Sequence, residues 1–402
     1  MTTTTESHTV RSASLSLPQY PLDPTRPAVD RYVAPVVLRS VNGEPPGSRF
    51  AGDPFSPFKI LNHLGVLQAV VRGETAPPVT VEIDPTNVCN HRCQWCVSTM
   101  SHNGEQFTLE QFVRLIGDIA RVGAKSVVLK GGGEQTLHKQ LNVMMRKVAD
   151  AGLSLGVITN GTMPWPDTPR ILLETADWVR ISLDAATAET HRLIHGARDF
   201  QRIVRNISFL TENARRTLVG LNFVAEPRNH REIRDFAKLG RSLGVAYVAI
   251  RCVFDPTVRL DRAVREEMRR QIEAAKSLAD EGFRVLAGNF SDAHLDAGPD
   301  RPFPYRRCLG PNLVGIIGGD GEVFACCFLR GNPAFSLGNV HRQGFDEIWA
   351  SDHRREVMQR ADRGDCGRIC MGIGGLSASR YHLYNELLDY LTLKPKAHAD
   401  FA

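Results

Sequence analysis

Short apolar runs alternate with longer amphipathic segments through the middle of this chain. The apolar runs lie at residues 79–83, 126–129, 154–159, 178–183, 219–224 and 246–251. The segments between them show helical periodicity, notably at 108–122, 137–151, 199–215, 229–243 and 260–281. Alternating strands and helices predict parallel strands joined by right-handed crossovers. Six such units predict an α/β fold with a partial (β/α)6 barrel rather than a closed eight-stranded one.

The segments before the first apolar run have a different character. Residues 1–50 are rich in Thr, Ser, Pro and Gly, which predicts a poorly ordered arm. Residues 56–73 carry an apolar pattern that ends at a glycine, so residues 51–78 are expected to hold a packing helix ahead of the first strand.

Composition places the protein among ordinary globular proteins. Its 402 residues are 42% hydrophobic and 23% charged, enough for a catalytic domain and a smaller second domain. The net charge of +5 is spread along the chain, so no nucleic-acid partner is expected. No run of 18 apolar residues and no signal peptide are visible, which predicts a cytoplasmic protein without a membrane partner. The nine cysteines are then better explained by metal ligation than by disulfides.

Three cysteines follow the first apolar run directly. Residues 79–96 read V-T-V-E-I-D-P-T-N-V-C-N-H-R-C-Q-W-C and place Cys89, Cys93 and Cys96 in the spacing C-x3-C-x2-C. Three thiolates leave one iron of a four-iron cluster open for a small molecule. The alternative is a zinc site completed by His91 or a distant cysteine, but zinc motifs more often pair two C-x2-C knuckles.

This run, with Trp95 before the last cysteine, resembles the radical S-adenosylmethionine (SAM) superfamily. The resemblance implies that SAM chelates the open iron of a [4Fe-4S] cluster. An electron from a donor such as flavodoxin or ferredoxin then cleaves SAM to methionine and a 5'-deoxyadenosyl radical. That radical abstracts a hydrogen atom from the substrate.

Polar and glycine-rich segments follow the later apolar runs, where parallel α/β folds place their chemistry. The segment Lys130-Gly-Gly-Gly-Glu134 resembles the superfamily motif that meets the amino group of SAM. The resemblance makes Asn160 and Ser182 contacts to its ribose or carboxylate, and Asp184 shares the strand face of Ser182. His195 stands where relatives frequently place Arg, which leaves Arg192 or Arg251 as the carboxylate partner. The cofactor-binding residues predicted in this way are Trp95, Gly132, Gly133, Glu134, Asn160, Ser182, Asp184 and Arg192.

A second group of cysteines lies late in the chain: Cys308, Cys326, Cys366 and Cys370. An apolar run, an Asp-Gly turn and a second apolar run predict a hairpin between the first two. The block resembles the SPASM/twitch auxiliary domain, which implies a second [4Fe-4S] cluster with Cys327 as a spare; zinc is the alternative. The expected divisions are a barrel at 79–290, an auxiliary domain at 291–380 and a tail at 381–402.

The fate of the substrate radical defines the reaction. Arg251 and Asp255 are predicted to share a strand face toward the substrate, with Arg251 holding an oxygen-bearing group and Asp255 accepting a proton. The resemblance implies an oxidoreductase of natural-product pathways, including antibiotic biosynthesis, that oxidises a hydroxyl-bearing carbon of a sugar or aminocyclitol. The alternatives are an epimerase, in which Cys252 would donate hydrogen, a dehydratase, and a peptide-modifying maturase.

Overall fold

A single ten-stranded sheet organises the protein. The computed structural model describes residues 57–96, 103–253, 258, 260–287, 305–366 and 376–392. The strand order is β10-β9-β8-β1-β2-β3-β4-β5-β6-β7, and the strands from β8 through β1 to β7 are parallel. The bounds of the first seven strands are β1 Thr80–Ile83, β2 Ser126–Leu129, β3 Ser154–Thr159, β4 Trp178–Ser182, β5 Leu218–Ala225, β6 Tyr247–Cys252 and β7 Arg284–Ala287.

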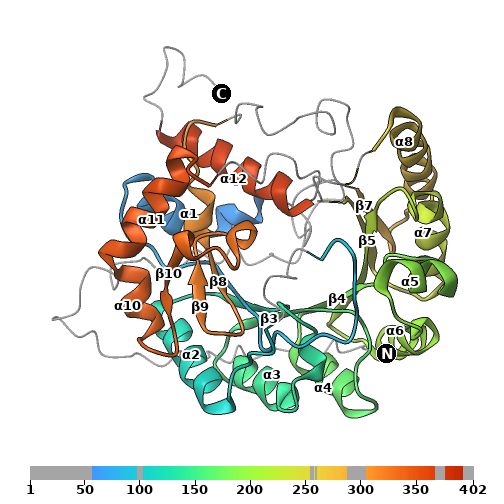
Figure 1. Ribbon diagram of the computed structural model, residues 1–402, viewed down its shortest axis with the longest axis horizontal. Coiled ribbons are helices and arrows are strands. Elements are labelled where there is room, and N and C mark those ends of the chain that lie inside the picture. Colours follow the sequence, from blue (N-terminus) through green and yellow to red (C-terminus); the bar gives the residue numbers. More distant parts are fainter. Residues whose placement is uncertain are drawn as a thin grey trace, which may run out of the picture.

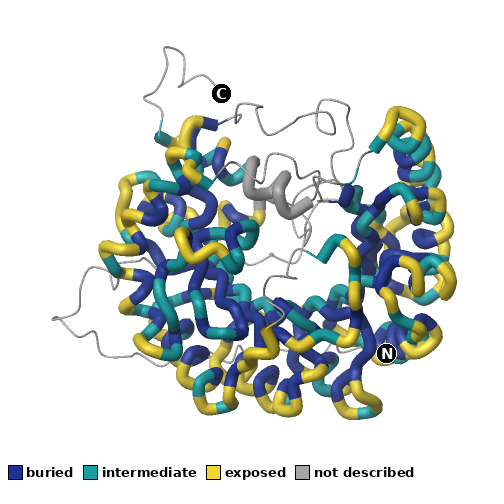
Figure 2. Tube along the Cα trace, in the orientation of Figure 1, coloured by how far each residue is buried: buried dark blue, intermediate teal, exposed yellow. Residues whose placement is uncertain are grey.

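Helices cover the convex side of the curved sheet (Figure 1). Buried residues lie along the strands and on the inward faces of these helices, while exposed residues follow the outer rim (Figure 2). The covering helices are α2 Leu109–Val122, α3 Leu141–Asp150, α4 Asp167–Thr175, α5 Ala188–His195, α6 Phe200–Asn213, α7 Ile233–Ser242 and α8 Arg262–Lys276, with short 3-10 turns η4 Gln135–Leu137 and η5 His230–Glu232. This arrangement confirms the predicted partial barrel, and it adds β7 and α4 to the predicted elements.

The predicted hairpin does not stand apart from the barrel. Its first strand, β8 (Val314–Ile317), pairs in parallel with β1, while β9 (Glu322–Phe324) and β10 (Ser336–Asn339) continue the sheet antiparallel. The helices α10 (Phe345–Ala350) and α11 (Asp352–Arg363) follow, and the short turns η6 Gly310–Leu313, η7 Cys327–Leu329 and η8 Pro333–Phe335 connect the strands. The cysteine-rich segment is therefore joined to the barrel by main-chain hydrogen bonds.

A second hydrophobic core joins the two ends of the described chain. The turn η2 (Pro57–His63) and helix α1 (Leu64–Val71) form the expected packing helix. Leu67 of this helix is buried with Leu313 and with Leu388 of helix α12 (Leu376–Thr392). Much of the segment expected as a tail is thus a packed helix. Among the described residues, no helix has the length and apolar character required to cross a membrane.

The two faces of the parallel strands differ in character. The face toward the helices is apolar and carries Val81, Val127 and Val179. The inner face begins with two tightly packed aromatic side chains. A Cβ on Gly156 would lie 2.2 Å from the Trp178 ring, and a Cβ on Gly220 would lie 2.1 Å from the Tyr247 ring. These glycines let the large rings lie flat across the strands at the amino end of the sheet.

We expect Gly156→Ala to lower the free energy of unfolding by about 1–3 kcal/mol, because the new methyl group would overlap the Trp178 ring. The matched control is Gly117→Ala within α2, where no atom lies within 4 Å of the new Cβ. That change should raise stability by about 0.5–1 kcal/mol. Denaturant unfolding of the anaerobic protein measures both, and equal stability of the two variants would contradict the packing argument.

Candidate functional site

The cysteine triplet lies on the loop that leaves β1 at the carboxyl end of the sheet. None of the three cysteines forms a disulfide, and all three are partly accessible. Burial, followed by Glu134 and then by Cys93 and Cys96, raises the pKa of Cys89 to about 11, against an opposing backbone hydrogen bond at His91. Three mutually repelling sulfur atoms on one short loop are a donor set that iron ions would stabilise as thiolates, so the residues present fit a cluster.

The glycine segment after β2 supports this loop through very close backbone contact. Gly133 N donates to Thr86 O at 3.0 Å, and Glu134 N donates to Val88 O at 2.8 Å. A Cβ on Gly133 would lie 2.1 Å from Val88 O, and one on Gly132 would lie 2.1 Å from the Asn87 side-chain oxygen. Any larger residue would displace the chain just before the first cysteine. The glycines therefore have a structural role in addition to the predicted contact with SAM.

Glu134 is 3% exposed and fully engaged within the protein. Its carboxylate accepts from Thr136 Oγ1 at 2.6 Å, from Thr159 Oγ1 at 2.7 Å and from Asn160 N at 2.6 Å. Burial raises its pKa, against the opposing effect of these donors. Asn160 in turn donates from its side chain to Asn90 Oδ1 at 2.8 Å. Glu134 and Asn160 thus tie the ends of β2 and β3 to the cysteine loop, and their contacts with SAM stay a prediction.

The other predicted cofactor contacts are placed in different environments. Ser182 lies on the partly accessible inner face of β4, whereas Arg192 lies on the exposed side of α5, between the buried His191 and His195. Trp95 packs against the main core, and the Arg228 guanidinium lies 5.9 Å from its ring centre. Only Ser182 has the placement expected for a SAM contact, and the geometry gives no support to Arg192.

Asp184 has a structural role at the end of β4. It is buried, its φ of 53° lies in the left-handed region, and its Oδ1 accepts from Val224 N at 2.7 Å. Its Oδ2 lies 3.1 Å from His195 Nε2. The carboxylate therefore orients a histidine, and its contact with SAM stays a prediction.

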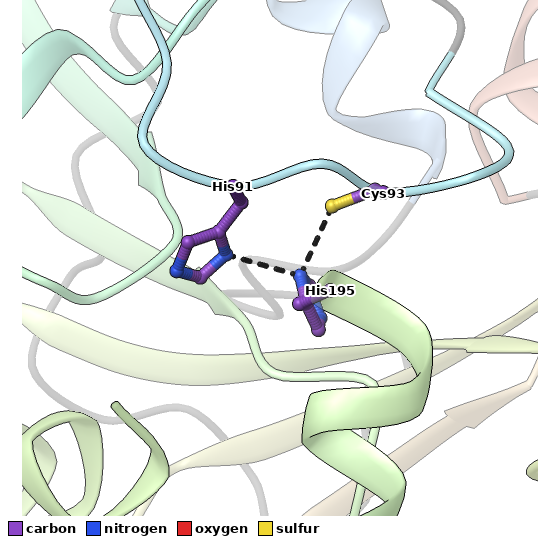
Figure 3. Close-up of side chains that lie close together, drawn as sticks. All are labelled: His91, Cys93 and His195. Carbon is purple, nitrogen blue, oxygen red and sulfur yellow. Dashed lines mark hydrogen bonds between the residues drawn. The ribbon is translucent and has the colours of Figure 1, made fainter. Parts of the chain in front are cut away.

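Three buried histidines gather beneath the cysteine loop, and the sequence did not predict this group. His91, His191 and His195 are each less than 5% exposed, and His191 stacks on His195 with ring centres 4.6 Å apart. His195 Nδ1 lies 3.1 Å from Cys93 Sγ and 3.3 Å from His91 Nδ1 (Figure 3). Asp199 accepts from both His91 and His191, at 3.0 and 2.9 Å. The i, i+4 spacing of His191 and His195 was the available signal.

The pKa values of His91 and His195 are shifted in opposite directions. Burial, followed by the neighbouring His195, lowers the pKa of His91 to about 4. Burial also opposes a charge on His195, yet hydrogen bonds to Asp184 and Cys93 raise the pKa of His195 to about 10. His91, Cys93 and His195 also offer ligand atoms within 4.8 Å of one another, which makes this group a candidate metal site. Its nitrogen atoms are already used in hydrogen bonds to carboxylates and to one another.

The late cysteines are placed on the hairpin side of the sheet. Cys326 donates to Cys327, and this hydrogen bond, followed by burial, raises the pKa of Cys326; Cys308 adds to the effect. The same hydrogen bond, with a smaller contribution from Lys130, lowers the pKa of Cys327. The assignment of Cys326 as a ligand, with Cys327 as the spare, stays a prediction. Cys366 is partly buried, and Cys370 falls outside the described residues.

The predicted substrate-facing pair is described only in part. Arg251 lies on the inner face near the end of β6, opposite Val224 of β5. The strand ends at Cys252, so the alternation of side chains cannot be extended to Asp255, which lies outside the described residues. Cys252 is 6% exposed within the main core, and burial raises its pKa to about 12. This packing favours the structural role predicted for Cys252 over hydrogen donation.

Comparison with protein families assigns both cysteine groups. Residues 83–240 match the radical SAM superfamily, and residues 308–372 match the SPASM iron–sulfur cluster-binding domain. The chain carries a radical SAM domain followed by a SPASM domain. Its cofactors are accordingly SAM, the cluster that binds it and an auxiliary iron–sulfur cluster. The zinc alternatives for the two sites are set aside.

Individual relatives are similar over most of the chain. The AdoMet-dependent heme synthase of Methanosarcina barkeri is 26% identical over 349 residues, which cover 80% of this chain and 96% of that protein. Mycofactocin maturase MftC of Mycolicibacterium smegmatis is 26% identical over 318 residues, covering 76% and 79%. The crystal structure of Streptococcus suis SuiB bound to precursor peptide SuiA has a TM-score of 0.59 at 14% identity, covering 79% of this chain and 75% of that one. At this identity the likeness shows the fold alone.

We expect the combined change of Cys89, Cys93 and Cys96 to Ala to remove about half of the roughly eight irons of a two-cubane protein, and with them all SAM cleavage. The variant should keep the auxiliary cluster, because the SPASM cysteines lie on a separate part of the sheet. Iron analysis and chromatography of 5'-deoxyadenosine measure the two effects. Formation of 5'-deoxyadenosine by this variant would contradict the assignment.

Proposed function

We propose that this radical SAM iron–sulfur enzyme modifies a peptide, rather than oxidising a sugar or an aminocyclitol. The observation that carries the proposal is the positive charge on the inner face of the sheet. The main support from comparison is the similarity to mycofactocin maturase over 76% of the chain, together with the fold shared with SuiB, a protein solved with a precursor peptide.

The inner charges surround Glu82 of β1. Lys130 pairs with Glu82, and Arg330, from the segment after the hairpin cysteines, lies 3.0 Å from Asp84 Oδ1. Although burial raises it, Lys130, Arg330 and Arg180 together hold the pKa of Glu82 below its usual value. Burial raises the pKa of Asp84 to about 6, against the opposing effect of Arg330. Glu82 is thus an anion, and Asp84, whose pKa lies below neutral pH, is also largely ionised beside Arg330.

Cations exceed anions on this face. Strand register places Glu82, Arg180 and Arg251 on the same side of the sheet. Alternate residues of a strand share a face, and paired residues of neighbouring strands do so too. Followed from strand to strand, the pairing leads from Glu82 to a residue two before Arg180, and from Arg180 to a residue four before Arg251. We name the set Lys130, Arg180, Arg251 and Arg330 the inner cation group. Within the part of the chain that the structure describes, these four cations outnumber the two carboxylates, Glu82 and Asp84, that pair with Lys130 and Arg330.

This excess of positive charge discriminates between the substrate classes. An aminocyclitol carries a protonated amine at neutral pH and would be repelled by the inner cation group. A peptide can present its C-terminal carboxylate or an acidic side chain, and an arginine fork matches that group in geometry and charge. A tetrapyrrole with carboxylate arms has the same charge, which is why the similarity to heme synthase makes such a substrate the second candidate.

In this proposal, different residues of the chain hold the cysteine loop and orient the substrate. When bound, the cluster and SAM supply the radical that abstracts a substrate hydrogen atom. The glycine segment and Glu134 hold the cysteine loop against β2 and β3. The inner cation group orients the anionic end of the substrate, and Trp178 and Tyr247 close the amino end of the inner face.

A labelling experiment tests the substrate class. Short peptides encoded by genes adjacent to this one would be prepared with deuterated amino acids and incubated anaerobically with the reconstituted enzyme, SAM and dithionite. We expect deuterium in 5'-deoxyadenosine and a mass change in one peptide. Deuterium transfer from a labelled aminocyclitol, with none from any of the peptides, would overturn the proposal. Transfer from a labelled tetrapyrrole would establish the second candidate.

We further expect Arg251→Gln to raise the KM for an acidic peptide by roughly 10- to 100-fold, as for the loss of one charge-assisted hydrogen bond of about 1.5–3 kcal/mol. SAM cleavage without substrate separates the two roles of Arg251: it stays unchanged if Arg251 binds the peptide and falls if Arg251 binds the carboxylate of SAM. The matched control is Arg205→Gln, on the exposed side of α6. Equal effects of the two changes on KM would show that Arg251 does not bind the substrate.

A further inference from the structure

His195 occupies a fixed position between the cysteine loop and the barrel. It is the last residue of α5 and is followed by Gly196, whose φ of 64° ends the helix. Its carbonyl accepts from Arg92 N at 2.9 Å, so the end of the helix is bonded to the cysteine loop itself. The ring is 2% exposed and makes contacts through both nitrogens.

The partners of the ring nitrogens determine where the protons lie. Nε2 of His195 faces only acceptors, Asp184 Oδ2 at 3.1 Å and Leu183 O at 3.1 Å, so this nitrogen carries a proton. Nε2 of His91 likewise faces Asp199 Oδ2 at 3.0 Å and carries a proton. With its proton on Nε2, the neutral ring of His91 offers a lone pair at Nδ1.

Among His195, Cys93 and His91, only His195 can then donate a proton to the other two. Its Nδ1 lies 3.1 Å from Cys93 Sγ and 3.3 Å from the lone pair of His91 Nδ1. A cysteine that ligates iron is a thiolate without a proton, so it can only accept. We propose that His195 donates a hydrogen bond from Nδ1 to the sulfur of Cys93, and that it is a positioning residue which, held by Asp184, raises the reduction potential of the SAM-binding cluster.

Asp184 fixes the donor in place at a conformational cost. A non-glycine residue is rarely found in the left-handed region unless its surroundings hold it there. Here Val224 N donates to Asp184 Oδ1 at 2.7 Å, which leaves Oδ2 directed at His195. In metal sites, a carboxylate commonly accepts a hydrogen bond from the second ring nitrogen of a histidine. This bond orients the ring and tunes the site.

The physical effect follows from charge. Reduction adds one electron to the cluster, and part of the added charge lies on the cysteine sulfurs. A hydrogen bond and a positive ring beside one sulfur stabilise the reduced state more than the oxidised state, so the potential rises. The proposal rests on the radical SAM domain and holds whichever substrate the enzyme takes. Its failure would leave the peptide proposal unaffected, and the reverse is also true.

The test is a potentiometric titration of the reconstituted protein, followed by electron paramagnetic resonance. The triple Cys89, Cys93 and Cys96 to Ala variant identifies the signal of the auxiliary cluster. We expect His195→Leu to shift the SAM-binding cluster to a more negative potential by about 59 mV, equivalent to a tenfold change in a one-electron equilibrium. Asp184→Asn should give a smaller shift in the same direction, and the auxiliary cluster should not move.

The matched control is His191→Leu. His191 lies one turn earlier on α5 and is equally buried, but it donates to Asp199 and makes no hydrogen bond to Cys93 among the described contacts. In His191→Leu, the reduction potential of the SAM-binding cluster should equal that in the unaltered protein. An unchanged potential in His195→Leu, an equal shift in His191→Leu, or equal shifts of both clusters would overturn the proposal. If His195→Leu fails to bind iron, His195→Gln and Asp184→Asn decide the question by the same measurement.

Discussion

Strand β1 is the element on which the two metal-binding parts of this protein depend. It pairs in parallel with β2 on one side and with β8 on the other, through main-chain hydrogen bonds that require no particular side chains. Because all three strands run the same way, the cysteine loop after β1 and the glycine segment after β2 emerge at one edge of the sheet. The turn after β8 emerges there too, and Arg330, which follows β9 and η7, reaches Asp84.

This shared edge explains the charge distribution. Glu82 and Asp84 lie on and just beyond β1, and their partners come from two other segments, Lys130 after β2 and Arg330 after β9. Buried charges are tolerated when they are paired, and the Arg330–Asp84 pair lies where the SPASM segment meets the barrel. In the proposed function, the inner cation group binds the anionic end of the substrate at this same edge.

Much of the barrel could be predicted because apolar runs and helical periodicity are local properties of the sequence. The strand ending at Thr159 has the predicted bounds, and the cysteine and glycine motifs fall at strand ends as expected. The histidine group could not be predicted, because His91 and His195 meet only after strands β1 to β4 have assembled. The exposed position of Arg192 could not be predicted for a related reason: motif position does not fix which side of a short helix faces the site.

The core that joins α1 and α12 has a consequence for the making of the protein. Leu67 is covered by Leu313 and Leu388, so its partners are translated more than two hundred residues later. At about 5–20 residues per second, an apolar helix face stays uncovered for tens of seconds while the barrel is already being made. Closing so long a loop is also slow, which delays this contact further. The nascent chain therefore exposes an apolar surface to chaperones and to other chains until synthesis is almost complete.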